Sequence, residues 1–181
     1  NWNADIALNL TSHYLLTRLV LPGMVKQGSG AIINISSVNG IQALGNPAYS
    51  AAKAGLISFT QTLATEYGPK GIRSNVILPG TIETPVWKHR VEARPDVFEK
   101  VKSWYPVGRV GKPEDIAAAV AFISANEAGF VNGASLAVDG GLTAGSFKMI
   151  KDMIGKRSLC FIQIIAFNKN EPTLVLITCH P

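Results

Sequence analysis

The chain has 181 residues, which is enough for one domain with a substantial apolar core. Hydrophobic residues make up 47% of it and charged residues 16%, a balance typical of buried parallel strands covered by helices. The net charge of +5 is scattered, with no basic run interleaved with aromatic residues, so we expect no nucleic-acid partner. No apolar run approaches ~20 residues, so we expect no membrane span.

The two cysteines, Cys160 and Cys179, both lie near the end of the sequence. They show neither Cys-x-x-Cys spacing nor a histidine at metal-site distance, so the sequence predicts no metal site. Such sparse cysteine usage fits a reducing compartment, and we expect a cytoplasmic protein.

Apolar residues recur with helical period in three stretches and form short β-rich runs in three others. In chain order, the pattern predicts a helix over residues 3–27, a strand over 31–35, a helix over 48–67, a strand over 72–78, a helix over 113–126 and a strand over 134–138. Glycine and proline separate these elements. The strand–helix alternation predicts an α/β fold with a parallel sheet and right-handed crossovers.

Residues 81–110 form a long connection between the second predicted strand and the third predicted helix. A connection of this length in a compact domain is usually functional, often a lid. Its aromatic residues Trp87, Trp104 and Tyr105 have two interpretations: they line a substrate pocket, or they pack the lid against the body of the domain. The sequence leaves both open.

The segment from Ile33 to Leu56 brings together residue types that exchange protons. Tyr49 and Lys53 are four residues apart on one helix face, so the ammonium lies close to the phenol. A nearby positive charge favours the phenolate, and such a phenol exchanges a proton with a carbinol or carbonyl oxygen. Ser36 and Ser37 come just before, where a strand ends, and open α/β sheets build their sites at such ends. The segment therefore predicts alcohol–carbonyl interconversion.

The same segment, INISSVNGIQALGNPAYSAAKAGL, resembles the active-site segment of the short-chain dehydrogenase/reductase family. The resemblance runs from about residue 2 to about residue 145 and includes NVILPGTIETP and VGRVGKPEDIA. It implies a Rossmann-like, doubly wound parallel sheet, of which only the last three strands are represented. The family's Gly-x-x-x-Gly-x-Gly turn would precede this region, so we expect an N-terminally truncated domain over residues 1–145. Its strand at 31–35 would have an unpaired edge.

The resemblance implies four catalytic positions. Tyr49 would be the general acid in reduction and the general base in oxidation, and Lys53 would support it and bind the nicotinamide ribose. Ser37 would hold the substrate oxygen and polarise the carbonyl. Ser36 is the alternative, since it lies thirteen residues before Tyr49 and Ser37 only twelve, and the longer spacing is frequent in the family. Asn9 would interrupt its helix and hold a water that passes protons to Lys53.

The resemblance also implies a nicotinamide cofactor, NAD or NADP, with a small-molecule alcohol or carbonyl compound as substrate. The implied cofactor residues are Tyr49, Lys53, Pro79, Gly80, Ile82 and Thr84. Pro79 and Gly80 would shape the cofactor loop, and the Ile82 backbone would meet the carboxamide. The layout is most similar to 3-oxoacyl-carrier-protein reductases and glucose-type dehydrogenases, and the intact enzyme would be a homo-oligomer, a dimer or tetramer.

Other function classes stay open. One is a non-catalytic fragment that pairs with intact homologous subunits through its helices. Another is a sugar-nucleotide epimerase or dehydratase, which also uses Tyr-x-x-x-Lys but normally carries a larger C-terminal substrate domain. A hydrolase is disfavoured, because neither His13 nor His89 has a serine or aspartate at a triad-like position.

Residues 146–181 lie outside the family resemblance. Two apolar runs, 159–167 and 173–178, predict a hairpin across residues 168–172. Non-native sequence from a gene-model boundary is an equally plausible origin of this tail. We assign it no chemical role.

Overall fold

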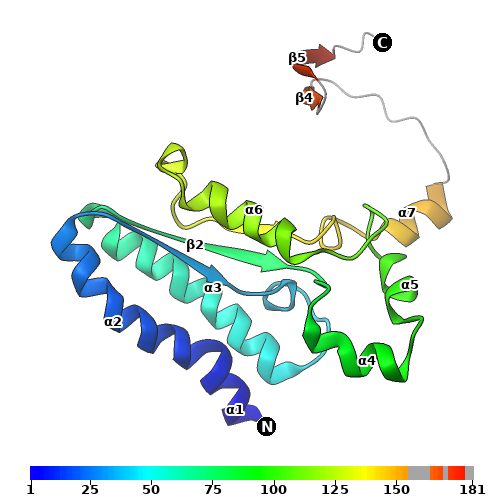
Figure 1. The fold of residues 1–181 in the computed structure, drawn as a ribbon, viewed down its shortest axis with the longest axis horizontal. Helices are drawn as coiled ribbons and strands as arrows, with labels where there is room; N and C mark the ends of the chain where they lie inside the picture. The colour runs from blue at the N-terminus through cyan, green and yellow to red at the C-terminus, as the bar shows by residue number, and fades with distance from the viewer. Residues whose placement is uncertain (155–163, 169–170, 178–181) are drawn as a thin grey trace. The chain divides into compact units, whose positions relative to one another are not determined.

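The computed structural model describes residues 1–154, 164–168 and 171–177 (Figure 1). It divides into two compact units, Asn1–Phe147 and Lys148–Pro181, which we describe separately. The first unit is an α/β domain with a parallel sheet, as predicted.

The elements of the first unit follow the predicted order, and the predicted helices and strands end within two residues of the observed ones. The helices are α1 (Trp2–Ile6), the π-helical turn η1 (Ala7–Thr11), α2 (Ser12–Gln27), α3 (Pro47–Tyr67), α4 (Lys88–Ala93), α5 (Val97–Lys102) and α6 (Pro113–Ser124). Short 3-10 turns are η2 (Val38–Gly40), η3 (Gly68–Lys70), η4 (Pro85–Trp87) and η5 (Asn126–Ala128). The strands are β1 (Gly30–Ile35), β2 (Ile72–Pro79) and β3 (Ser135–Val138), and α7 (Phe147–Ile154) begins at the unit boundary.

The sheet has the order β1-β2-β3, and both pairs of neighbours are parallel. Consecutive β2 residues, Val76, Ile77 and Leu78, are all at most 2% exposed. Side chains of consecutive strand residues point to opposite faces, so both faces of the central strand are covered. This explains why β2 reads in the sequence as a continuous apolar run rather than an alternating one.

The helices α3 and α6 cover opposite faces of the sheet (Figure 1). Val76 and Leu78 share a core cluster with Ile57 of α3. Arg73, which points to the other face, donates to the carbonyl of Ile123 in α6 at 2.8 Å. Both crossovers, β1 to β2 through α3 and β2 to β3 through α6, move in the same direction across the sheet. Since their helices lie on opposite faces, the two crossovers have opposite hands. The prediction of right-handed crossovers throughout is therefore wrong for one of the two.

That departure follows from the long connection between β2 and α6. A short strand–helix connection favours the right-handed crossover because the twist of the strand directs the chain that way. Here the chain passes through η4, α4 and α5 before α6 begins, so the direction in which β2 ends no longer decides the face that α6 covers.

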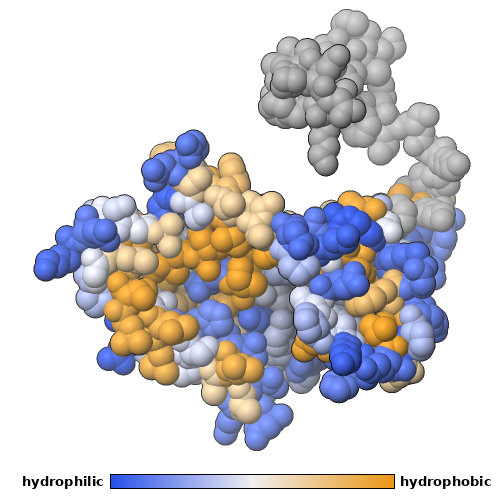
Figure 2. Space-filling view, in the orientation of Figure 1, coloured by the Kyte–Doolittle hydropathy of each residue, from blue (hydrophilic) through white to orange (hydrophobic). Residues whose placement is uncertain are grey.

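One edge of the sheet is open. Among the described residues, β1 pairs with β2 on one side and with no strand on the other, and Ile35 is 37% exposed. The neighbouring helix α2 also exposes apolar side chains, including Leu16 at 63% and Leu19 at 77%. Figure 2 shows hydrophobic residues across the part of this face that α2 and the strands occupy. Such an edge and helix face together resemble an interface that lacks its partner.

The second unit contains a hairpin. β4 (Ile164–Asn168) pairs antiparallel with β5 (Glu171–Ile177), with an irregularity between Phe167 and Asn168. The predicted hairpin is confirmed over these strands, whereas residues 159–163, 169–170 and 178 lie outside the described residues. None of the helices in the described ranges has the length and apolar character needed to cross a bilayer.

The turn that leads into β2 provides a test of the packing at the start of the sheet. Gly71 has a φ of 78°, and a Cβ there would collide with the carbonyl oxygen of Gly28. Gly45 has a similar φ of 86° but open space around it. We expect Gly45→Ala to lower the free energy of unfolding by about 1 kcal/mol, from backbone strain alone. Gly71→Ala should cost at least about 2 kcal/mol more, because backbone must also move. Urea unfolding followed by circular dichroism measures both, and equal losses would contradict the close approach.

Candidate active site

The candidate site lies at the carboxyl ends of β1 and β2. Ser36 and Ser37 follow directly after β1, and Gly80 follows β2. Parallel strands bring their carboxyl ends to the same edge of a sheet, which is where open α/β sheets bind ligands. Tyr49 and Lys53 reach this edge from the first two turns of α3.

The two serines have different roles in the structure. Ser36 is 4% exposed, and its hydroxyl donates to the backbone carbonyl of Lys53 at 2.8 Å. This bond ties the end of β1 to α3. The Ser37 hydroxyl instead accepts the backbone N–H of Asn39 at 3.2 Å and caps η2. The Ser37 hydroxyl also donates to the side-chain oxygen of Asn39 at 3.3 Å. Ser36 is thus bound to α3 and Ser37 to its own turn.

Lys53 is buried between α3 and the end of β1, at 7% exposure. Its Nζ donates to the carbonyl of Ile35 at 3.0 Å and lies 5.6 Å from the centroid of the Tyr49 ring. Burial lowers the pKa of Lys53, because the charged form loses hydration. The predicted proximity of the ammonium and the phenol is therefore present.

Gly40 explains the Ser-x-x-Gly pattern. A Cβ at Gly40 would lie 2.9 Å from the carbonyl carbon of Lys53 and 3.0 Å from its oxygen. Only glycine lets η2 pack directly on the backbone of α3 at this point. The strand end and η2 thus surround the helix turn that carries Lys53.

Asn9 lies in the π-helical turn η1, so the helix is locally interrupted at the predicted position. The Asn9 amide donates to the carbonyl of Asp5 at 3.0 Å and is half-buried. Leu10 packs on α3 at Gly55, where a Cβ would lie 3.0 Å from its Cδ2. Within the part of the chain that the structure describes, no hydrogen bond joins Asn9 to Lys53 directly. A π-turn of this kind frequently marks a functional site.

His13 is a titratable group near this site to which the sequence assigns no role. Burial, and to a smaller extent the positive charge of Lys53, lowers the pKa of His13. Its Nδ1 lies 3.3 Å from the hydroxyl of Ser12. The sequence offers one sign that His13 belongs to the site: it lies four residues after Asn9, on the same helix face. This sign is weak, because the sequence does not show what that helix face contacts.

The loop after β2 is held as a short parallel bridge between Ile82 and Gly111. Gly111 N–H donates to the Thr81 carbonyl at 2.9 Å, and Glu83 N–H donates to the Gly111 carbonyl at 2.8 Å. Both hydrogen bonds of this bridge are made by the neighbours of Ile82, namely Thr81 and Glu83. The N–H and C=O of Ile82 itself therefore point away from Gly111. A neighbouring donor and acceptor on one residue suit a primary carboxamide, which carries one of each. The loop therefore fits a nicotinamide carboxamide.

The other implied loop residues lie around this bridge. Pro79 is the last residue of β2, and Gly80 N–H donates to the Val138 carbonyl at 3.2 Å. A Cβ at Gly80 would lie 3.0 Å from the Tyr105 ring, a tight contact that favours glycine there. Thr84 is half-buried and accepts the N–H of Trp87 through its carbonyl at 3.0 Å, at the start of η4.

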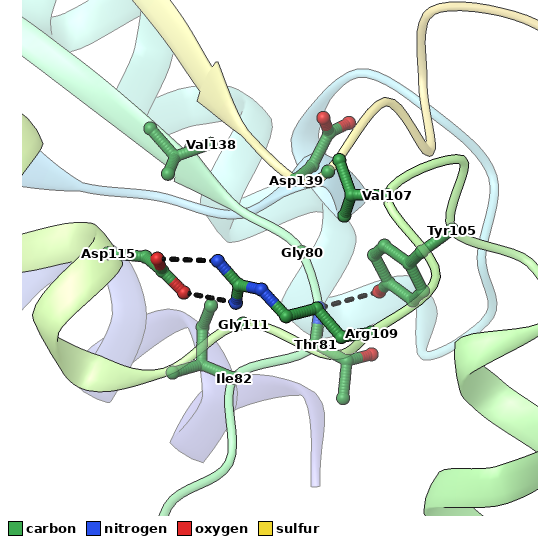
Figure 3. Close-up of a pocket in the computed structure, with 11 residues that line it drawn as sticks. Gly80, Thr81, Ile82, Tyr105, Val107, Arg109, Gly111, Asp115, Val138 and Asp139 are labelled. Atoms are coloured by element: carbon green, nitrogen blue, oxygen red, sulfur yellow. Dashed lines mark hydrogen bonds and ion pairs between the residues drawn. The ribbon is translucent and has the colours of Figure 1, made fainter. Parts of the chain in front are cut away.

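A small cavity of about 130 Å³ adjoins this loop (Figure 3). Its lining comes from the loop, the end of the long connection, the start of α6 and the turn after β3: Gly80, Thr81, Ile82, Tyr105, Val107, Arg109, Gly111, Asp115, Val138, Asp139 and Gly140. Arg109 pairs with both oxygens of Asp115, at 2.7 and 2.9 Å, and holds the pKa of that carboxyl well below its usual range. Ser37, Tyr49 and Lys53 do not line this cavity.

The aromatic residues of the long connection separate into two groups. Tyr105 is 3% exposed and packs the connection against the body of the domain. Trp104 is 59% exposed, and Trp87 contacts the Phe98 ring at a centroid distance of 5.5 Å within the connection itself. Of the two interpretations, the burial of Tyr105 supports packing of the connection against the domain, although its ring also lines the cavity described above.

Known proteins resemble the first unit closely. A family model described as enoyl-(acyl carrier protein) reductase matches residues 1–143. Acetoacetyl-CoA reductase from Cupriavidus necator is 44% identical over 146 residues, which cover 80% of this chain and 58% of that protein.

Solved structures agree with the sequence relatives. An oxidoreductase of the short-chain dehydrogenase/reductase family from Burkholderia thailandensis has a TM-score of 0.84 and 49% identity, over 86% of this chain and 61% of that one. ElxO with bound NADP has a TM-score of 0.72 and 28% identity, over 76% of this chain and 56% of that one. The chain spans about three fifths of the length of these relatives. By sequence and by fold, the chain belongs to the short-chain dehydrogenase/reductase family.

Proposed function

We propose that this region carries the reactive part of an NAD(P)-dependent oxidoreductase that interconverts an alcohol and a carbonyl compound. The observation that carries the proposal is the buried Lys53 ammonium, 5.6 Å from the Tyr49 ring at the carboxyl end of β1. This arrangement places a proton-exchanging phenol beside a fixed positive charge, next to a serine hydroxyl.

Each side chain has a defined task in this proposal. Tyr49 donates a proton to the carbonyl oxygen in reduction and accepts it in oxidation. The Lys53 ammonium stabilises negative charge that develops on the Tyr49 oxygen during proton transfer, and it binds the cofactor ribose. The Ser37 hydroxyl donates a hydrogen bond to the substrate oxygen, where negative charge develops in the transition state. Asn9 in the π-turn supplies a polar group for a water that returns protons to Lys53.

The cofactor loop orients the nicotinamide. The Ile82 N–H and C=O bind the carboxamide, and the Thr84 hydroxyl adds a contact at the same group, while Pro79 and Gly80 set the path of the loop. When bound, the nicotinamide supplies or accepts the hydride, and the protein provides position and electrostatics. NADP bound to ElxO supports NAD or NADP as the cofactor class.

The relatives support 3-oxoacyl thioesters as the substrate class. Acetoacetyl-CoA reductase, 44% identical, acts on such a compound by its name. The exposed apolar residues of α2 support assembly of the intact enzyme as a homo-oligomer, since a face of this kind needs a cover.

The first prediction concerns Tyr49 in a fusion enzyme, in which the part of C. necator acetoacetyl-CoA reductase that precedes the matched region is joined to Asn1. Tyr49→Phe removes one hydroxyl and should leave the fold intact. The loss of proton transfer should lower kcat by ~10²–10⁴-fold. Initial rates of NADPH oxidation with acetoacetyl-CoA measure this. Tyr14→Phe on α2 is the matched control and should keep its activity; near-normal turnover by Tyr49→Phe would rule out the mechanism.

The second prediction concerns Lys53 in the same fusion enzyme. Lys53→Met keeps the length of the side chain but removes the ammonium beside Tyr49. The kcat should fall, because the ammonium that stabilises negative charge on the Tyr49 oxygen during proton transfer is lost. The KM for the cofactor should rise as well, because the ribose contact is lost. Lys26→Met on exposed α2 is the control. An unchanged kcat together with an unchanged cofactor KM would show that Lys53 has no part in the reaction.

The third prediction concerns the 181-residue chain by itself, which we expect to be inactive. Its sequence contains no Gly-x-x-x-Gly-x-Gly turn to bring backbone amides and a helix N-terminus to the pyrophosphate. Contacts to the nicotinamide and ribose alone are too few to offset the entropy of association. Calorimetric titration with NADH and NADPH should show no micromolar binding. Micromolar affinity for either, or measurable carbonyl reduction, would contradict this expectation.

A second candidate function is a non-catalytic partner of intact homologous subunits. It is favoured by the open edge of β1 and the exposed apolar face of α2. Sedimentation of the chain with purified C. necator acetoacetyl-CoA reductase distinguishes the two. The partner role would be favoured by three results together. The chain forms a stable mixed complex, the chain does not bind the cofactor, and the fusion enzyme does not turn over substrate.

A further inference from the structure

Tyr105 makes a hydrogen bond at the point where the sheet no longer supports the cofactor loop. The β1 register ends at the pair Ile35 and Ile77, and the β3 register ends at Val138 and Pro79. Gly80 is still bound to β3 through the carbonyl of Val138, so Thr81 is the first loop residue that lies beyond both neighbouring strands. There the hydroxyl of Tyr105 accepts the backbone N–H of Thr81 at 2.7 Å (Figure 3).

The Tyr105 ring is fixed on both sides by backbone. A Cβ at Gly80 would lie 3.0 Å from its Cε1, and a Cβ at Gly140 would lie 3.2 Å from its Cδ1. The ring thus fits between the turn after β2 and the turn after β3, at 3% exposure. Val107 N–H donates to the Gly140 carbonyl at 3.3 Å, which fastens the connection next to the ring. A phenol held in this way has little freedom to move away from Thr81.

Both backbone polar groups of Thr81, its N–H and its C=O, are consequently bound, and by different segments. Its N–H donates to Tyr105, and its carbonyl accepts from Gly111. Glu83 on the far side of Ile82 is bound to Gly111 as well. The residues on either side of Ile82 are therefore fixed, which sets the direction in which its own N–H and C=O point.

We infer that Tyr105 is a positioning residue, whose hydroxyl fixes Thr81 so that Ile82 presents its N–H and C=O to a nicotinamide carboxamide. The carboxamide part of this inference rests on the proposed function. Tyr105 also ties the end of the long connection to the cofactor loop, so the state of the lid and the orientation of the carboxamide contact are coupled through one side chain.

Amide hydrogen exchange of the 181-residue chain, measured by NMR, tests the positioning role without cofactor. Tyr105→Phe keeps the ring between the two turns and removes only the acceptor. Without its acceptor, the buried Thr81 N–H destabilises the closed state of the loop. Amide exchange at Thr81 should therefore become about 10-fold faster or more. Val76 and Ile77 in β2 should exchange at unchanged rates, and Tyr14→Phe should leave Thr81 unchanged. Unchanged exchange at Thr81 in Tyr105→Phe, or equal acceleration at all three residues, would overturn the inference.

The wild-type chain gives a second measurement, should Tyr105→Phe not fold. A Thr81 amide hydrogen-bonded to Tyr105 should be protected from exchange although it lies outside both strand registers. An unprotected Thr81 amide in the wild-type chain would overturn the inference.

Titration with nicotinamide mononucleotide then separates the inference from the proposed function. In the wild-type chain the Ile82 amide resonance should shift at millimolar concentrations, and Tyr105→Phe should need several-fold more ligand for the same shift. Nicotinic acid mononucleotide, which lacks the amide, should produce a smaller Ile82 shift in both. No response of Ile82 in the wild-type chain would contradict the proposed cofactor loop while the exchange experiment still decides the role of Tyr105. Equal affinity of wild type and Tyr105→Phe would overturn the inference.

Discussion

The double attachment between Lys53 and the end of β1 is the constraint from which the rest of the site follows. The Lys53 ammonium donates to the carbonyl of Ile35, and the Lys53 carbonyl accepts the hydroxyl of Ser36. One residue is thus joined to the strand at its side chain and at its backbone. Gly40 allows η2 to close over the same helix turn. A buried ammonium is tolerated only where such partners satisfy it, so the position of the reactive helix and the charge state of the site depend on each other.

The cofactor loop is built on a different principle. β3 binds it only at Gly80, and from Thr81 onward its backbone groups are bound, within the described residues, by Gly111 before α6 and by Tyr105 at the end of the long connection. Glycine at positions 80 and 140 makes room for the Tyr105 ring. The N–H and C=O of Ile82 point away from Gly111, to the other side of the bridge that joins these two residues. The sheet thus provides the rigid scaffold, and the loop after β2 would provide the contacts to a ligand, an arrangement that is common where loops carry function.

Among the described residues, the outer edge of β1 is unpaired, and the neighbouring helix α2 exposes apolar side chains. In an isolated domain, a parallel strand normally has neighbours and covering helices on both faces. The relatives are longer than the matched region, which covers about three fifths of their length. An unpaired edge beside exposed apolar side chains is the kind of surface that proteins usually cover.

The sequence by itself determined the elements, their order and the residue types of the reactive segment. Periodicity and glycine–proline punctuation act over a few residues, and the four-residue spacing of Tyr49 and Lys53 places them on one helix face in any context. The tertiary structure alone decided which serine hydroxyl is engaged by α3, which face α6 covers, that His13 lies near Lys53, and that Tyr105 binds Thr81. These features depend on contacts between segments distant in the chain. The partner of a hydroxyl or an amide across such a distance is set by packing, which local sequence patterns do not encode.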